Sequence, residues 1–346
     1  MTKYIIRRLL QAIPLLLTIS LILFVLLQAV GDPLSTMGGR VPTRPDDRVR
    51  LARQLGLDKP IITQYLFWLV GNDWLYAVDT DGDGRDDAYG ERRGVLRGDF
   101  GESIMVRGKP AMEIILEKLP NTLLLMVTSE IVIVVLSLAM GVYSAIKQYS
   151  LLDNLFTTFS FIMFSMPIFW LALMLLFIFG VNFKLAGFPI YFPTIGMYDV
   201  IEGPTIQQVA WHLVLPVLTI SLISIAGYSR YIRSVMLEVL SSDYIRTARA
   251  KGIAQTRVLF VHALKNASLP LVTLVGLDLP LLLGGAVVTE KIFGWPGMGS
   301  TYITHLDRAD FPVLMAILMM ISVAVVFFQL LTDIVYTWLD PRIRYN

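Results

Sequence analysis

The sequence contains no cysteine and few charged residues, and both deficits limit what the chain can be. Without cysteine, disulfide bonds, thiol catalysis and cysteine-based metal sites are excluded. Asp, Glu, Lys and Arg make up only 16% of the residues, against about 25% in ordinary soluble domains. The three histidines, His212, His262 and His305, are too scattered in the sequence to predict a histidine-rich metal centre.

Common catalytic motifs are absent as well. No G-x-x-x-x-G-K-[ST] occurs, since RGKP at 107–110 lacks both the earlier glycine and the final Ser or Thr. No H-E-x-x-H and no G-x-S-x-G are present either. The net charge of +2 gives no indication of a nucleic-acid partner. The sequence therefore predicts neither an enzyme, an ATPase nor a nucleic-acid-binding protein.

Long apolar runs dominate what is present, with 55% of the residues hydrophobic. Runs of about 20 apolar residues cross a bilayer as helices. The first run follows a basic N-terminus and is longer than the apolar region of about 7–15 residues in a signal peptide, so we expect it to be retained. The sequence predicts an all-α integral membrane protein with six transmembrane helices, at about 9–30, 121–146, 155–181, 209–234, 268–290 and 312–338.

Basic residues concentrate before the first predicted span and after the second, fourth and sixth. They are Lys3, Arg7, Arg8, Lys147, Arg233, Arg246, Arg249, Lys251, Arg257, Lys265, Arg342 and Arg344. Short cytoplasmic segments are enriched in Lys and Arg, which predicts that both termini are cytoplasmic. Residues 1–30 would then hold the N-terminal end and first span, 31–120 an extracytoplasmic segment, 121–338 the transmembrane core with a cytoplasmic loop at 236–268, and 339–346 a cytoplasmic tail.

The loop between the fourth and fifth spans reads SSDYIRTARAKGIAQTRVLFVHALKNASLPLVT at 241–273. Ser242 or Asp243 can cap a short helix, and Gly252 can end that helix in a left-handed conformation. A second helix is expected at about 255–266. On charge alone, an ordinary basic loop on the cytoplasmic side explains the segment equally well.

Two stretches of this loop, DYIRTARAKG at 243–252 and HALKNASLP at 262–270, resemble the coupling loop of ABC-importer permeases of the dipeptide/oligopeptide/nickel family. The resemblance extends over nearly the whole chain and is to the first, B-type permease. It is carried further by LGLD at 55–58, QY at 64–65, Trp68, GDFGES at 98–103, LPNT at 119–122, LLGGAVVTEKIFGWPGMG at 282–299 and DPRIR at 340–344.

The resemblance implies a type I importer permease with an extracytoplasmic insertion between the first two spans, in a prokaryotic cell (inner) membrane. ATP would be hydrolysed by two partner ABC ATPases. A second six-helix permease, or a copy of this chain, would complete the pore within the lipid, and an extracytoplasmic binding protein would deliver peptides or similar small solutes.

The same resemblance assigns contact with the ATPase to residues of the coupling loop. Tyr244, Ile245 and Ala248 would offer an apolar face, with Arg246, Arg249 and Lys251 at its rim, and Gly252 would be the most sensitive position. The complete set is Tyr244, Ile245, Arg246, Thr247, Ala248, Arg249, Lys251 and Gly252.

An acidic run, DTDGDGRDD at 79–87, lies inside an insertion at 71–97. Its spacing matches the ligand positions of a calcium loop, with Gly84 at the sharp turn. The ligands would be Asp79, Asp81, Asp83, the Arg85 carbonyl and Asp87. Gly90 stands where an EF-hand has its bidentate Glu, and no helical pattern flanks the run. The sequence predicts a weak structural Ca²⁺ site, with a solvated acidic turn as the alternative.

Two carboxylates, Glu130 and Asp278, fall inside predicted spans. Charge within a bilayer is costly and marks translocation pathways, although a protonated or hydrogen-bonded carboxylate at a helix contact is the alternative. Both residues are therefore candidates for the pathway. An ion-coupled secondary transporter or channel with an extracellular calcium loop is the alternative function, but it leaves DYIRTARAKG unexplained. A membrane enzyme is more distant, for want of a catalytic constellation.

Overall fold

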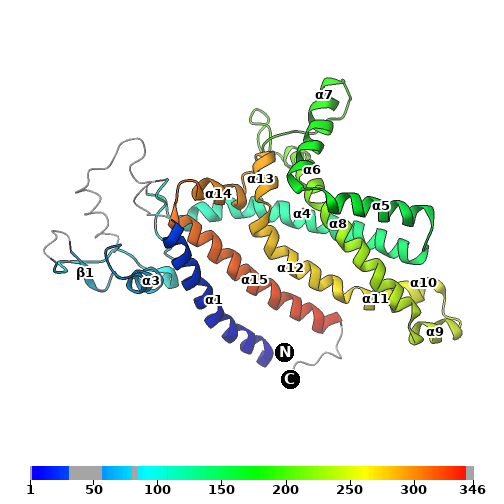
Figure 1. The fold of residues 1–346 in the computed structure, drawn as a ribbon, viewed down its shortest axis with the longest axis horizontal. Coiled ribbons are helices and arrows are strands. Elements are labelled where there is room, and N and C mark those ends of the chain that lie inside the picture. Colours follow the sequence, from blue (N-terminus) through cyan, green and yellow to red (C-terminus); the bar gives the residue numbers. More distant parts are fainter. Residues whose placement is uncertain (1, 31–56, 80–83, 107, 340–346) are drawn as a thin grey trace. The chain divides into compact units, whose positions relative to one another are not determined.

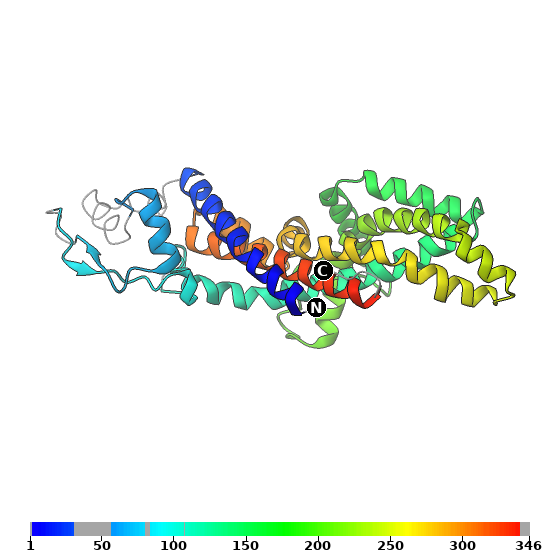
Figure 2. The same cartoon turned by 90° about the horizontal axis from the view of Figure 1, so that it is seen from below.

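The computed structural model describes residues 2–30, 57–79, 84–106 and 108–339, which are helical apart from one short hairpin and connecting loops (Figures 1 and 2). The chain divides into two compact units. The first gathers Asn121–Ser300 with short stretches from both chain ends, and the second gathers Ile6–Pro120 with Thr301–Val323. The predicted all-α class is confirmed.

Five helical segments in the described residues are long and apolar enough to cross a membrane. They are α1 (Thr2–Val30), α4 (Ala111–Ile146), the continuous run of α6 (Ile168–Leu175), the π-helical η2 (Leu176–Asn182) and α7 (Phe183–Leu185), then α8 (Ile206–Ser241) and α15 (Phe311–Leu339). Two further helical segments, Gln255–Ala267 and Pro270–Leu282, are bent by 47° relative to each other at the break between them. Counted together as one span, they make the sixth.

The predicted third span at 155–181 is wrong in its boundaries. A separate helix, α5 (Leu151–Ser165), ends at Met166, and the spanning segment starts afresh at Ile168. Pro167 causes the break, because proline disfavours helical dihedrals in the residue before it and offers no amide hydrogen. Met166 accordingly adopts an extended backbone (φ −84°, ψ 131°). Apolar composition alone does not reveal this break.

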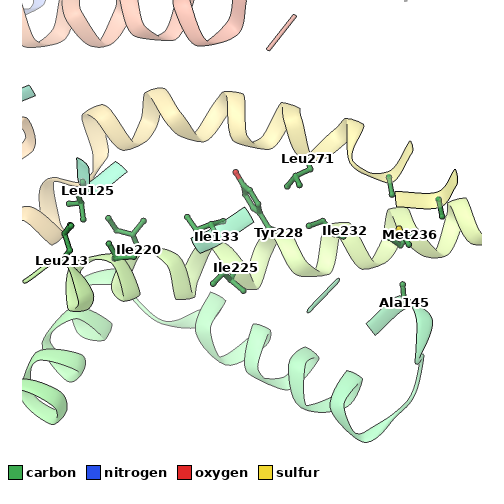
Figure 3. Close-up of a cluster of buried hydrophobic side chains, with 14 of the residues drawn as sticks. Leu125, Ile133, Ala145, Leu213, Ile220, Ile225, Tyr228, Ile232, Met236 and Leu271 are labelled. Carbon is green, nitrogen blue, oxygen red and sulfur yellow. The ribbon is translucent and has the colours of Figure 1, made fainter. Parts of the chain in front are cut away.

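In the first unit, α5 runs beside α8 (Figures 1 and 2). Both helices start with a hydroxyl cap: Ser150 Oγ accepts from Asp153 N, and Thr205 Oγ1 accepts from Gln208 N. Apolar side chains from α4, α8 and α12 (Leu269–Gly285) form the core of this unit (Figure 3). The buried members labelled there are Leu125, Ile133, Ala145, Leu213, Ile220, Ile225, Tyr228, Ile232, Met236 and Leu271.

The first unit also contains short helices that follow α8 and α12. They are α9 (Asp243–Ala250), α10 (Gln255–Arg257), the π-helical η3 (Val258–Ala263), α11 (Leu264–Ala267), α13 (Val287–Phe293) and the first turn of α14 (Met298–Leu306). In Figure 1, α9, α10 and α11 lie together at the C-terminal end of α8. This end of the unit carries the segment predicted to couple to an ATPase.

The second unit contains α3 (Ile61–Val70), a hairpin of β1 (Tyr76–Val78) and β2 (Ala88–Tyr89), and the 3-10 helix η1 (Val95–Arg97). Its core is aromatic: Phe24 lies 5.6 Å from Tyr65 and 5.8 Å from Trp68 between ring centroids, and Trp68 lies 6.3 Å from Phe100. The QY, Trp68 and GDFGES segments of the sequence therefore meet in one cluster.

Candidate functional site

The segment after α8 has the predicted helix–turn–helix form. Helix α9 is Asp243–Ala250, and Gly252 follows it with φ +76°, so the left-handed turn at this glycine is confirmed. The second helical stretch, α10 to α11, covers the range predicted for it. The predicted side-chain cap is wrong, because the Ser242 hydroxyl donates to Val239 O (2.6 Å) instead of accepting from an amide of α9.

Helix α9 has two unlike faces. Ile245 (0% exposed) and Ala248 are buried in the chain's own core, beside Val258 and Ala263 of η3. The expectation that Ile245 and Ala248 offer an apolar face to a partner is therefore wrong, since both side chains already hold the segment together. The exposed polar and aromatic side chains are Asp243, Tyr244, Arg246, Thr247, Arg249 and Lys251, and the Asp243 carboxylate lies 3.6 Å from Arg246 Nη1.

The exposed face of α9 is thus basic, with one aromatic ring. Tyr244 keeps about half of its surface exposed, and its hydroxyl accepts a hydrogen bond from Asn266 Nδ2 at 2.9 Å. This bond ties α9 to α11 across the turn. The contact of these residues with an ATPase stays a prediction.

The two carboxylates predicted for the pathway lie in different surroundings. Asp278 of α12 accepts a hydrogen bond from the Tyr228 hydroxyl of α8 at 2.7 Å, and Figure 3 shows Tyr228 pointing from α8 toward α12. Glu130 of α4 is buried, and neither of its carboxylate oxygens has a hydrogen-bond partner among the described residues.

A third buried carboxylate, Glu290 of α13, received no role from the sequence. It is 0% exposed, and its oxygens accept from Thr122 Oγ1 (3.0 Å) and from Ser300 N (2.8 Å). Thr122 Oγ1 in turn accepts from Met298 N at 2.7 Å. A side chain at Gly297 would collide with the Glu290 carboxylate, so this loop passes the carboxylate only because residue 297 is glycine.

Trp295 and Asn121 complete this network. Trp295 Nε1 donates to Asn121 O, and Asn121 Nδ2 donates to Pro296 O, both at 2.9 Å. The LPNT and EKIFGWPGMG stretches of the sequence are therefore two sides of one hydrogen-bonded junction in the first unit. A carboxylate followed by an aromatic, proline and glycine-rich stretch is the only sequence signal of this junction.

In the second unit, Asp310 gathers the GDFGES loop. Its carboxylate accepts from Ser103 Oγ (2.5 Å), Ile104 N and Met105 N (both 3.1 Å), and His305 Nδ1 lies 2.8 Å from it. Burial raises the pKa of Asp310, but the bonds from His305, Ser103 and the two amides outweigh burial and hold the pKa below its ordinary 3.8. Sequence reasoning missed this site.

The described ends of the acidic run adjoin β1 and β2, so strands rather than helices stand on its two sides. Asp79 Oδ2 accepts from Gly84 N at 3.0 Å, and Gly84 has φ +87°. Of the predicted ligands, Asp79, Arg85 and Asp87 are described, whereas Asp81 and Asp83 lie outside the described residues. No group of three or more acidic or histidine side chains suited to a metal occurs within the described ranges.

Comparisons with known proteins match the chain from end to end. Residues 137–345 match the family described as binding-protein-dependent transport system inner membrane component, and residues 1–126 match the N-terminal component described for the same systems. The oligopeptide transport system permease protein AppB of Bacillus subtilis (strain 168) is 41% identical over 346 residues, covering 100% of both chains. The dipeptide transport system permease protein DppB of Escherichia coli (strain K12) is 35% identical over 366 aligned residues, again covering 100% of both.

Proposed function

Because the chain belongs to the family of binding-protein-dependent transport system inner membrane components, we propose that it forms the translocation pathway of an importer for di- or oligopeptides. The chain is a permease subunit, and ATP is hydrolysed by the partner ATPases of such importers. Support for peptide substrates comes from relatives named as oligopeptide and dipeptide permeases, which match over their full lengths.

The main support for a coupling role is the division of α9 into a buried side and an exposed side. Its buried side, Ile245 and Ala248, fixes the helix to the core, and its exposed side is basic. A helix held in this way transmits a push as a rigid body, which is how an ATPase closing on one side reorients the spans. Tyr244, Arg246, Thr247, Arg249 and Lys251 make the contact, and Ile245, Ala248 and Gly252 hold its geometry.

The proposed assembly has six spans in this chain and both termini in the cytoplasm. The bent pair that ends in α12 counts as the fifth span. Residues 31–120, with the insertion 71–97, lie outside, 236–268 face the ATPase, and 339–346 form a cytoplasmic tail. A second six-helix permease or a copy of this chain completes the pore, with two ATPases and one binding protein. Glu130 and Asp278 border the pathway.

Gly252 tests the coupling proposal. Space around the glycine is open, so a side chain there meets no neighbour, and its cost comes from the backbone at φ +76°. A β-branched residue in this region costs about 1–2 kcal/mol, whereas Asn tolerates it. In liposomes holding the whole importer, we expect Gly252→Val to keep ATP hydrolysis while transport falls, and Gly252→Asn to transport near the normal rate. Normal transport by Gly252→Val would contradict the assignment.

We also propose that the hairpin loop at 79–87 binds Ca²⁺ weakly and holds the insertion in shape. The bond from Gly84 N to Asp79 supports this, because it joins the first and sixth positions of the predicted loop. Titration calorimetry on the purified full chain should show a dissociation constant of roughly 10⁻⁴–10⁻³ M. The variant Asp79→Asn should lose this heat. Equal heats from both proteins would contradict the site.

The function is tested by isolating the tagged protein from native membranes in mild detergent and identifying what comes with it. Two ATPases, a second permease and a binding protein are expected. The complex in liposomes should then accumulate peptides only when ATP is supplied. Uptake by the chain alone, without ATP, would overturn the importer and favour the ion-coupled transporter.

A further inference from the structure

Two arginines one turn apart on α8 have different partners. Arg233 makes a paired contact with the buried Asp153, from Nε (2.9 Å) and Nη2 (3.0 Å). No carboxylate lies within ion-pair distance of Arg230 in the part of the chain that the structure describes. A membrane-spanning helix therefore carries one neutralised cation and one that has no counter-charge among the described residues.

Arg230 is held in place by uncharged groups. Its Nε donates to Ala226 O at 2.9 Å, and its guanidinium carbon lies 5.1 Å and 4.7 Å from the ring centroids of Phe161 and Phe164 on α5. Cation–π contacts of this kind stabilise an arginine away from water. They leave the Nη donors without a protein acceptor among the described residues.

The direction of the side chain argues against a lipid-facing role. A long basic side chain near the end of a spanning helix normally extends toward the nearer membrane surface, where phosphate groups lie. Arg230 is nearer to the C-terminal end of α8, yet its bond to Ala226 turns the guanidinium toward the N-terminal end. The guanidinium thus lies on the N-terminal side of its own backbone position, away from the C-terminal end of α8.

The site is also open. Phe161 and Phe164 are 55% and 60% exposed, and Arg230 is partly exposed, so the chain itself does not fill the space over the guanidinium. The free edge of a guanidinium matches a carboxylate, which it binds through two parallel hydrogen bonds. An occupant with a carboxylate next to an apolar group fits both the cation and the rings.

We propose that Arg230, backed by Phe161 and Phe164, binds the C-terminal carboxylate of a peptide as it passes through the permease. This inference rests on the proposed import of peptides. Every unmodified peptide carries this group whatever its sequence, so one arginine serves a pathway that accepts many sequences. Discrimination among side chains is then left to the binding protein.

The test compares peptides with and without that carboxylate. The complete importer is placed in liposomes, and ATP-driven uptake is measured for a mixture of di-, tri- and tetrapeptides and for the same mixture amidated at the C-terminus. The measured quantity is the ratio of the two uptake rates. Because the binding protein is the same throughout, its own preference cancels when the ratio for Arg230→Gln is divided by the ratio for the unaltered chain.

We expect Arg230→Gln to lower the preference for the free carboxylate by about tenfold, the size of one lost charge-assisted hydrogen-bonding contact. Arg230→Lys should keep part of the preference, since it keeps the charge but not the planar fork. Arg93→Gln, at an exposed arginine outside the spanning helices, should leave the ratio unchanged.

A variant Arg230→Gln that slows both mixtures by the same factor, or slows neither, would overturn the inference and leave peptide import standing. A complex with the unaltered chain that takes up neither mixture would instead remove the proposed function on which the inference rests. Fluorescence-detected gel filtration of each variant, together with its basal ATP hydrolysis, separates misassembly from loss of the site.

Discussion

Glu290 and Glu130 are both buried carboxylates of the first unit, at 0% and 5% exposure, yet their surroundings are opposite. Glu290 accepts from a hydroxyl and a backbone amide, and a glycine makes room for it. Glu130 has no hydrogen-bond partner among the described residues. Burial is therefore similar, and the supply of hydrogen-bond donors is what distinguishes the two carboxylates.

Two aspartates extend this comparison. Asp310 resembles Glu290 in being well supplied with partners, since four polar groups lie within hydrogen-bond distance of its carboxylate. These contacts join a loop to the start of α15. Asp278 has a single tyrosine donor, which places it closer to Glu130. The number of donors predicts how much stability each carboxylate contributes, because an unmade buried hydrogen bond costs more than a made one gains.

The largest effect is expected at Glu290. Glu290→Ala removes the acceptor for the Thr122 hydroxyl and for Ser300 N and opens a cavity, which should lower the free energy of unfolding by about 3 kcal/mol or more. Thermal unfolding of the detergent-solubilised chain measures this. Glu290→Gln is the matched control, since it keeps the volume and one acceptor and should cost less. If Glu290→Ala unfolds at the temperature of the unaltered chain, donor supply is the wrong criterion.

A smaller, pH-dependent effect is expected at Asp310. Because the folded state lowers the pKa of Asp310, its ionised form stabilises the fold above the ordinary 3.8, and this contribution is lost as the pH falls through the lowered pKa. Asp310→Asn should cost about 1–3 kcal/mol at neutral pH. The difference from the unaltered chain should shrink under acid conditions. A difference that stays constant from neutral to acid pH would show that Asp310 acts through shape rather than charge.

The smallest effect on stability is expected at Glu130. Glu130→Gln removes a buried charge that no described donor supports, so the free energy of unfolding should not fall, while ATP-driven uptake should fall. Asp278→Asn is the companion variant, with transport lowered and membrane expression kept. A loss of stability in Glu130→Gln as large as that in Glu290→Ala would contradict the comparison. Unchanged uptake in both Glu130→Gln and Asp278→Asn would show that neither carboxylate takes part in the pathway.

Much of the fold follows from local sequence. Apolar runs predict the spans, and Gly252 predicts the end of α9, because a left-handed turn strongly favours glycine. The third span was misplaced because hydrophobicity is continuous across Met166 and Pro167 while the backbone is not. A proline between two apolar runs was the available signal.

The candidate site could be predicted only in part. The stretch DYIRTARAKG located the coupling segment, but it did not indicate that Ile245 and Ala248 face inward. The side that a short helix buries depends on which elements pack against it. Glu290 and Asp310 were missed because their donors lie far away in the sequence: Thr122 and Ser103 come from segments more than a hundred residues earlier.

By itself the sequence determined the membrane class, the all-α fold class and the family, because each of these depends on composition, local pattern or a run of neighbouring residues. Only the tertiary structure decided which charges are satisfied. Arg233 and Arg230 lie one turn apart on the same helix and have the same side chain. Their surroundings differ: Asp153 forms an ion pair with Arg233, whereas two phenylalanine rings of α5 contact the guanidinium of Arg230. Hydrogen bonds and ion pairs form only over a few ångströms. Which groups become partners therefore depends on the packing between segments that are distant in the chain.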